Sequence, residues 1–240
     1  MGKYFEELAY QCTQLGELTL SRRRIPSLGT TDIYEIKLND EYLMSSLFFG
    51  SEVALATLGL ESCQSQELDV IVGGLGLGFT AAAALDDARV KSLFVVEFLE
   101  PVISWHKNEM IPLGKRLSSD SRYRFRLGDF FRLAAGEPEG FDPEAQDRLF
   151  HAILLDIDHS PKHFLNSSHS TFYEEAGLRA MCKQLHEGGV FALWSNDPPE
   201  KGFIDKLKAV FPVCTAHVVS FPNPIQQGES RCTVYVAVKA

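Results

Sequence analysis

A cluster of glycines directly after a short apolar run is the first feature of this sequence that could bind a reactive ligand. The run spans residues 70–72, an alanine-rich stretch begins at Thr80, and the glycines between them are Gly73, Gly74, Gly76 and Gly78. Glycine allows positive φ angles and lets a ligand approach the main chain closely. A helix that begins here would also offer free N–H groups. The pattern predicts a buried strand, a tight turn and a helix start that bind a nucleotide.

Acidic residues follow the next predicted strands along the chain. Glu97 ends the run 92–97, about twenty residues after the glycines, where an acid can accept hydrogen bonds from ribose hydroxyls. Asp129 follows the run 123–126, and the run 152–156 ends in Asp156 and continues to Asp158 and His159. Ligands of open α/β sheets lie outside the carboxyl ends of the strands. We therefore expect these side chains to surround one site.

The last three of these residues are the candidates for acid–base chemistry. A carboxylate within hydrogen-bond reach can hold a protonated amine and accept its proton, and Asp156 is the first candidate for this role. Asp158 would share a face with Asp156 if the strand continued through both residues. His159 precedes Ser160 and Pro161, so it could instead anchor a turn, as either acid could cap one.

Strands and helices alternate from residue 51 to residue 240. Strands are predicted over 70–72, 93–96, 123–126, 152–156, 190–194, 216–221 and 232–238, and helices over 51–60, 79–85, 101–117, 130–134, 171–185 and 201–211. This order predicts a mostly parallel seven-stranded sheet with helices on both faces. No helix separates the last two strands, so they should form an antiparallel hairpin at the sheet edge.

The first fifty residues predict a different structure. Residues 3–15 can form a short amphipathic helix, whereas 17–21, 32–38 and 41–44 are rich in β-formers and separated by turn residues. We expect a small antiparallel sheet here. The predicted domains are therefore an N-terminal helix and β-sheet (1–50) and a Rossmann-like nucleoside-binding catalytic domain (51–240).

Composition limits the classes of partner. A formal net charge of −9 argues against nucleic acid as the main partner, because phosphate binding favours a basic surface. The 5 cysteines are scattered without any Cys-x-x-Cys pair, so we expect reduced thiols and no metal site. The first residues do not resemble a signal peptide, and no stretch has the length of a membrane span. These features predict a cytoplasmic protein that binds no membrane.

The order of these motifs resembles the class I S-adenosylmethionine-dependent methyltransferase fold. Within that fold, the chain is similar to the spermidine synthase (polyamine aminopropyltransferase) family. The matching segments are Val-Gly-Gly-Leu-Gly-Leu-Gly at 72–78, Val-Val-Glu at 95–97, Leu-Gly-Asp-Phe at 127–130 and Leu-Leu-Asp at 154–156. The similarity covers residue 18 to the end of the chain.

The resemblance implies a co-substrate and a role for each matching residue. The donor would be decarboxylated S-adenosylmethionine, with its nucleoside on the glycine loop, Glu97 on the ribose and Asp129 on the adenine amine. Phe98 and Phe130 could flank the adenine ring, or belong to the core. Asp156 would be catalytic and the acceptor a small amine or polyamine. The family commonly forms dimers, so a homodimer is an arrangement to test.

Two departures from the family leave the acceptor open. The family has Asp-x-x-Asp at the fourth strand of this domain, whereas here His159 stands three residues after Asp156. Segments 43–49 and 51–55 also lack the Tyr and Gln that seat the polyamine in the family. An S-adenosylmethionine-dependent methyltransferase, a non-catalytic nucleotide-binding protein and a dinucleotide-dependent oxidoreductase are therefore the alternatives. Asp129 and the terminal hairpin argue against the oxidoreductase.

Overall fold

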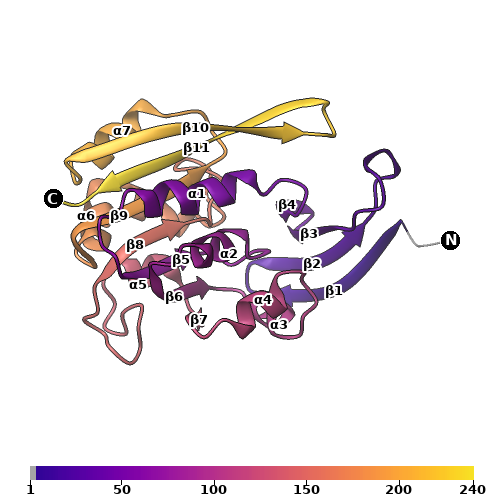
Figure 1. Ribbon diagram of the computed structural model, residues 1–240, viewed down its shortest axis with the longest axis horizontal. Helices are drawn as coiled ribbons and strands as arrows, with labels where there is room; N and C mark the ends of the chain where they lie inside the picture. Colours follow the sequence, from indigo (N-terminus) through magenta and orange to yellow (C-terminus); the bar gives the residue numbers. More distant parts are fainter. Residues whose placement is uncertain (1–3) are drawn as a thin grey trace.

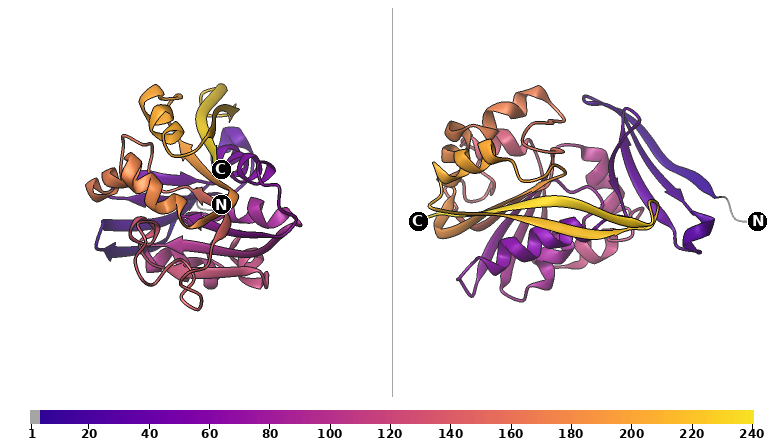
Figure 2. Two further views of the ribbon diagram at one scale, coloured as in Figure 1. Left: turned by 90° about the vertical axis from the view of Figure 1, so that its left-hand side faces the viewer. Right: turned by 90° about the horizontal axis from the view of Figure 1, so that it is seen from above.

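The computed structural model describes residues 4–240, which form two β-sheets with helices on both faces of the larger one (Figure 1). The smaller sheet is antiparallel and has the strand order β1-β2-β3-β4. The larger sheet has the order β10-β11-β9-β8-β5-β6-β7. Figure 2 shows the small sheet at one end of the large one, with the β10–β11 hairpin extending toward it.

The small sheet consists of four strands at the beginning of the chain: β1 (Phe5–Thr13), β2 (Gly16–Arg23), β3 (Ile33–Leu38) and β4 (Glu41–Ser45). A short 3₁₀ helix, η1 (Pro26–Leu28), lies between β2 and β3. The predicted strands at 17–21, 32–38 and 41–44 correspond to β2, β3 and β4.

The predicted helix over 3–15 is wrong for the residues that the structure describes. Phe5–Thr13 pairs with β2 along its length, with a shift in register between Glu7 and Ala9. Such a bulge interrupts the alternation of a strand, and so the apolar residues around Leu8 lose the period of two that identifies strands. Pairing with β2 outweighs the local helical pattern. Lys3 lies outside the described residues.

The large sheet confirms the predicted mostly parallel arrangement. Its strands are β5 (Leu68–Gly73), β6 (Val90–Glu97), β7 (Tyr123–Leu127), β8 (Phe150–Leu155), β9 (Leu185–Ser195), β10 (Val213–Asn223) and β11 (Gly228–Val238). The strands β5 to β9 pair in parallel, and the hairpin of β10 and β11 joins β9 antiparallel.

Two layers of helices cover the sheet, and strand side chains alternate between them. Val70 and Val72 pack with the helices α1 (Gly50–Glu61), α2 (Phe79–Asp86), α3 (Glu100–Lys107) and α4 (Gly114–Ser119). Ile71 packs on the other face with α5 (Phe130–Ala134), α6 (Glu175–Cys182) and α7 (Lys201–Lys208). The core therefore lies on both faces of β5, at the centre of the sheet.

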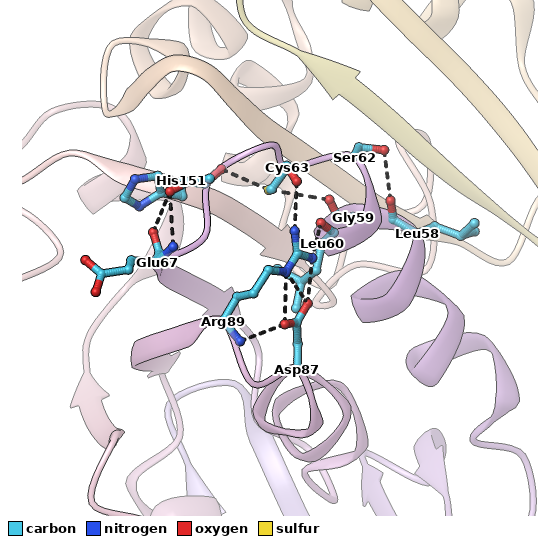
Figure 3. Close-up of polar contacts among 10 residues, drawn as sticks. Leu58, Gly59, Leu60, Ser62, Cys63, Glu67, Asp87, Arg89 and His151 are labelled. Atoms are coloured by element: carbon cyan, nitrogen blue, oxygen red, sulfur yellow. Dashed lines mark hydrogen bonds and ion pairs between the residues drawn. The ribbon is translucent and has the colours of Figure 1, made fainter.

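Arg89 fixes the C-terminal end of α1 against the sheet (Figure 3). Its guanidinium donates to the carbonyl oxygens of Leu60 and Cys63, each at 2.9 Å, and pairs with the Asp87 carboxylate at 2.6 Å. Carbonyls at a helix end otherwise lack partners. Because α1 leads directly into β5, this anchor holds the opposite, N-terminal end of α1 beside the carboxyl ends of the parallel strands.

Two predicted helices are shorter than expected. The segment 101–117 forms α3 and α4, separated by Glu109 at a φ of 56°. The segment 171–185 contains the end of a 3₁₀ helix, η2 (Ser167–Tyr173), then α6, and β9 already begins at Leu185. The Gly188–Gly189 pair resembles a turn in the sequence but lies inside β9, where Gly188 has a φ of 73°.

No helix among residues 4–240 has the length and apolarity needed to cross a membrane.

Candidate functional site

A cavity of about 530 Å³ opens at the carboxyl ends of the parallel strands. The large sheet contributes the glycine loop, Glu97, Asp129 and Asp156, while the small sheet contributes residues of β3 and β4. Residues at the tip of the β10–β11 hairpin complete the wall. Its volume is in the range of small-molecule sites. The fold thus brings most of the predicted site residues around one space.

The glycine loop after β5 needs its glycines for two different reasons. Gly74, Gly76 and Gly78 have φ angles of 94°, 46° and 90°, which L side chains rarely adopt. A Cβ on Gly74 would lie 2.1 Å from the main-chain oxygen of Asp156. A Cβ on Gly73 would lie 2.6 Å from the Phe130 ring. The loop therefore packs too closely against its neighbours for any larger residue.

Three neighbours hold the main chain of this loop. Glu97 Oε2 accepts a hydrogen bond from Leu75 N at 3.0 Å, and Met44 Sδ lies 2.9 Å from Leu77 N. His106 Nε2 lies 2.9 Å from the Gly76 oxygen. Burial lowers the pKa of His106 to about 4, so this imidazole is neutral and donates from Nε2. The loop is therefore fixed from β4, β6 and α3.

Glu97 is buried at the end of β6 but still reaches the cavity. Its two oxygens accept from Leu75 N and Leu99 N, at 3.0 and 2.8 Å. Burial raises the pKa of Glu97, and these main-chain donors partly offset that effect. Each carboxylate oxygen retains a second lone pair, with which it could accept from a ribose hydroxyl.

Asp129 lies at the end of the cavity formed by β7 and α5. Its Oδ1 caps α5 by accepting from Phe131 N at 2.9 Å and Arg132 N at 3.3 Å. Phe98 is partly exposed and Phe130 is almost fully buried, and both line the cavity. Phe130 packs under Gly73 and within the aromatic core, so its role in the fold is structural whether or not it touches a ligand.

Asp156 follows directly after β8, is half-buried and lines the cavity. Thr80 Oγ1, in the first turn of α2, donates to Asp156 Oδ2 at 2.7 Å. Burial raises the pKa of Asp156 to about 6, although the Thr80 hydrogen bond opposes that rise. A carboxylate with such a pKa can exchange a proton near neutral pH.

Glu52, in the first turn of α1, is a second carboxyl group in the same part of the cavity. It is buried and accepts a hydrogen bond from Ser51 Oγ. Burial, followed by the charge of Asp156, raises the pKa of Glu52 to about 8. The sequence analysis missed Glu52, because an acid in the first turn of a helix is ordinary there. Glu52 is buried and Asp156 is half-buried, and neither carboxyl group forms an ion pair with a cation of residues 4–240.

The structure separates Asp158 from His159. His159 lines the cavity and its main-chain oxygen accepts from Asn196 N at 2.8 Å. Asp158 is buried behind the cavity wall and does not line it. Since β8 ends at Leu155, the expected alternation does not extend to Asp158. Its carboxylate instead bonds His169, a cavity residue that lies between the strand predicted over 152–156 and the helix predicted over 171–185.

The raised pKa of Glu52 predicts how the stability of the ligand-free protein depends on pH. The unfolded chain loses this proton near pH 4.5, whereas the folded protein retains it to about pH 8. The free energy of unfolding should therefore fall as pH rises from about 5 to 8, by a few kcal/mol. Urea unfolding at both pH values should show this slope in the wild type and a weaker one in Glu52→Gln.

The matched control for this experiment is Glu229→Gln, which removes one charge from an exposed position. It should leave the pH slope as it is in the wild type. Equal slopes in Glu52→Gln and Glu229→Gln would contradict the assignment of a protonated Glu52 in the folded protein.

Within residues 4–240, no three His, Cys, Asp or Glu side chains are grouped as metal ligands would be.

The order of strands and the terminal hairpin define the class I methyltransferase type of α/β fold.

No family model matches the sequence, and no curated protein matches it. Among solved structures, a spermidine synthase in complex with the transition-state analogue AdoDATO is similar, with a TM-score of 0.74 and 16% sequence identity over 98% of this chain and 74% of that one. The spermidine synthase from Thermotoga maritima has a TM-score of 0.72 and 16% identity, over 98% and 72% of the two chains. The chain thus has the fold of a spermidine synthase, with a small N-terminal sheet ahead of the α/β sheet.

Proposed function

We propose that the protein transfers an aminopropyl group from decarboxylated S-adenosylmethionine to an amine. The observation that carries this proposal is the pair of carboxyl groups, Glu52 and Asp156, that line the cavity beside the glycine loop. Two carboxyl groups with raised pKa values favour a cationic ligand, because an ammonium would offset their mutual repulsion. The negative charge of Asp156 would repel the carboxylate of intact S-adenosylmethionine. The structural similarity to a spermidine synthase bound to a transition-state analogue supports this choice.

The residues of the chain would divide the work between the two substrates. The glycine loop, Glu97 and Asp129 would bind the nucleoside of the donor, with Phe98 against its base. The donor supplies a sulfonium whose adjacent carbon accepts a nucleophile. Glu52 and Asp156 would hold the acceptor amine next to that carbon, and Asp156 would take its proton, with His159 beside them.

The proton must leave before the amine can attack. An alkylamine is protonated near neutral pH, because the pKa of its ammonium form is close to that of lysine, about 10.4. The ammonium form has no free electron pair with which to attack. Asp156 accepts the proton, a bond forms between the nitrogen and the donor carbon, and the carbon–sulfur bond breaks. The sulfonium becomes a neutral thioether. Holding the two reactants in line supplies most of the acceleration in such a reaction.

Ligand-dependent thermal stability tests this proposal against its rivals. A ligand that binds only the native state raises the apparent stability. We expect decarboxylated S-adenosylmethionine and methylthioadenosine to raise the melting temperature more than S-adenosylmethionine or NAD at equal concentration. A stronger effect of S-adenosylmethionine would indicate a methyltransferase, and a stronger effect of NAD an oxidoreductase. If no adenosyl compound stabilises the protein, the proposed transferase function is wrong.

A measurement of turnover then distinguishes an enzyme from a non-catalytic binding protein. Incubation with decarboxylated S-adenosylmethionine and a panel of diamines and polyamines should release methylthioadenosine in the presence of an amine. Donor binding without release of the thioether for any amine would support the non-catalytic alternative.

A further inference from the structure

His169 occupies an unusual position in the cavity wall. It lies in η2, its side chain is 12% exposed, and it lines the cavity near Asp129 and Phe131. Its Nδ1 lies 2.9 and 3.1 Å from the two carboxylate oxygens of Asp158. The ring also stacks on Phe131, with centroids 3.8 Å apart and planes at 23°. Both the position and the plane of this imidazole are therefore fixed.

The partners of Asp158 assign the proton on the imidazole. Asp158 is fully buried and accepts from Tyr173 OH at 2.9 Å and from Leu165 N at 2.8 Å. A carboxylate that accepts these bonds is an acceptor for His169 as well, so Nδ1 of His169 carries a hydrogen and donates. In the neutral imidazole, Nε2 is then an acceptor. Asp158 is a positioning residue that determines which nitrogen of His169 can accept.

The accepting nitrogen is available to a ligand. Among the described residues, His169 makes its hydrogen bonds through Nδ1, and Nε2 is not one of the buried polar atoms left without a partner. Nε2 therefore has accessible surface, and His169 lines the cavity. The His169 ring stacks on Phe131, and Phe131 lies in α5, the helix that Asp129 caps. Asp129 Oδ1 is bound to α5, and its Oδ2 makes no hydrogen bond within the described residues.

These two acceptors lie at one end of the cavity, and the carboxyl pair lies on the other side of Glu97. The strands that lead to Asp129, Glu97, the glycine loop and Asp156 are β7, β6, β5 and β8, and they are neighbours in the sheet in this order. A nucleoside whose ribose is bound by Glu97 and whose sulfonium faces Asp156 must direct its base toward Asp129. The amino group of a 6-aminopurine has two N–H donors, which two acceptors could bind.

We propose that His169 Nε2 accepts a hydrogen bond from the 6-amino group of the donor's purine, beside Asp129, and makes the site selective for adenine over a 6-oxopurine. This inference rests on the proposed function, because it requires an adenosyl donor in the cavity. A 6-oxopurine would present an oxygen to two acceptors. A site built around hydrogen bonds discriminates strongly against an analogue that cannot make them.

Two substitutions of His169 remove the accepting nitrogen, and each keeps a different one of the ring's other contacts. His169→Phe keeps a ring against Phe131, and His169→Asn keeps a donor near Asp158 but has no atom in the place of Nε2. The probes are methylthioadenosine and methylthioinosine, which differ at the 6-position, with affinities measured by calorimetry. The wild type should bind methylthioadenosine at least about 100-fold more tightly.

Both variants should lose about 10-fold in affinity for methylthioadenosine and much less for methylthioinosine. Their selectivity for methylthioadenosine over methylthioinosine should therefore fall. Their circular dichroism spectra should match that of the wild type, which shows that the variants are folded. The matched control is His163→Asn, at a histidine of the same segment whose side chain is 69% exposed and does not line the cavity. It should keep the selectivity of the wild type.

The outcomes distinguish this inference from the proposed function. If the wild type binds methylthioadenosine and both His169 variants retain its selectivity, His169 does not recognise the base, while the proposed function stands. If the wild type binds no adenosyl compound, the proposed function fails and this inference fails with it. Failure of one variant to fold leaves the other as the test.

Discussion

Replacing Asp156 with asparagine should reduce the rate of amine transfer by about 10²–10⁴-fold while leaving donor affinity nearly unchanged. Asparagine has a similar shape and can still interact with Thr80, but it cannot accept a proton or neutralise an ammonium. Asp156 lines the cavity with a pKa of about 6, so it is the group best suited to take the amine's proton. Release of methylthioadenosine measures turnover, and calorimetry with methylthioadenosine measures donor-site affinity.

Asp129→Asn should give the opposite pattern. It changes a group at the far end of the cavity, where Asp129 caps α5 and faces the proposed base site. We expect it to weaken donor binding more than it lowers the maximal rate. Full turnover in Asp156→Asn would remove Asp156 from the mechanism. If Asp156→Asn and Asp129→Asn changed turnover and donor affinity in the same way, Asp156 would not serve the acceptor while Asp129 serves the donor.

Substituting Gly74 by alanine should destabilise the protein by several kcal/mol and abolish donor binding. The residue has a φ of 94°, and its new Cβ would lie 2.1 Å from the Asp156 oxygen, which is main chain and cannot rotate away. Either the loop or the end of β8 must move, which separates the two halves of the proposed site. Urea unfolding measures the loss of stability, and thermal shift with methylthioadenosine measures the loss of binding.

Gly136→Ala is the matched control for this effect. Gly136 has a φ of 91°, so alanine there meets the same backbone strain, but no atom lies within 4 Å of the Cβ position. The left-handed conformation alone should cost about 1–2 kcal/mol. The difference between the two variants isolates the close contact with Asp156. Equal losses of stability would show that strain, rather than the packing of the loop against β8, explains the need for glycine at position 74.

The sequence predicted the sheet correctly because its signals are local. Apolar runs, glycine turns and the missing helix before the final strand each specify a piece of the α/β order, and the handedness of crossovers arranges the pieces. The same local reasoning failed for β1, where a bulge near Leu8 disturbs the alternation. It could not place Asp158 either, because Asp158 lies beyond the end of β8 at Leu155, where the alternation of a strand no longer determines the direction of a side chain.

The acceptor side of the site depends on packing between distant segments. Glu52 joins Asp156 only because Arg89 and the core fix α1 across the sheet. His169 becomes a defined acceptor only through Asp158, which precedes it by eleven residues and is hidden behind the wall. In the sequence, Glu52 is an ordinary acid at the start of a helix, and His169 is one of several histidines without a motif. Their environment, not their position in a motif, gives them chemical character.

The contact between Met44 and the glycine loop bears on whether the chain can be divided. Met44 belongs to β4, and its sulfur is the partner of Leu77 N in the loop of the large sheet. A chain cut before residue 51 would lose this partner and the cavity wall formed by β3 and β4. The α/β segment alone would therefore contain only part of the cavity lining. The small sheet is an integral part of the cavity, so truncation of the N-terminal strands would open the cavity as well as shorten the chain.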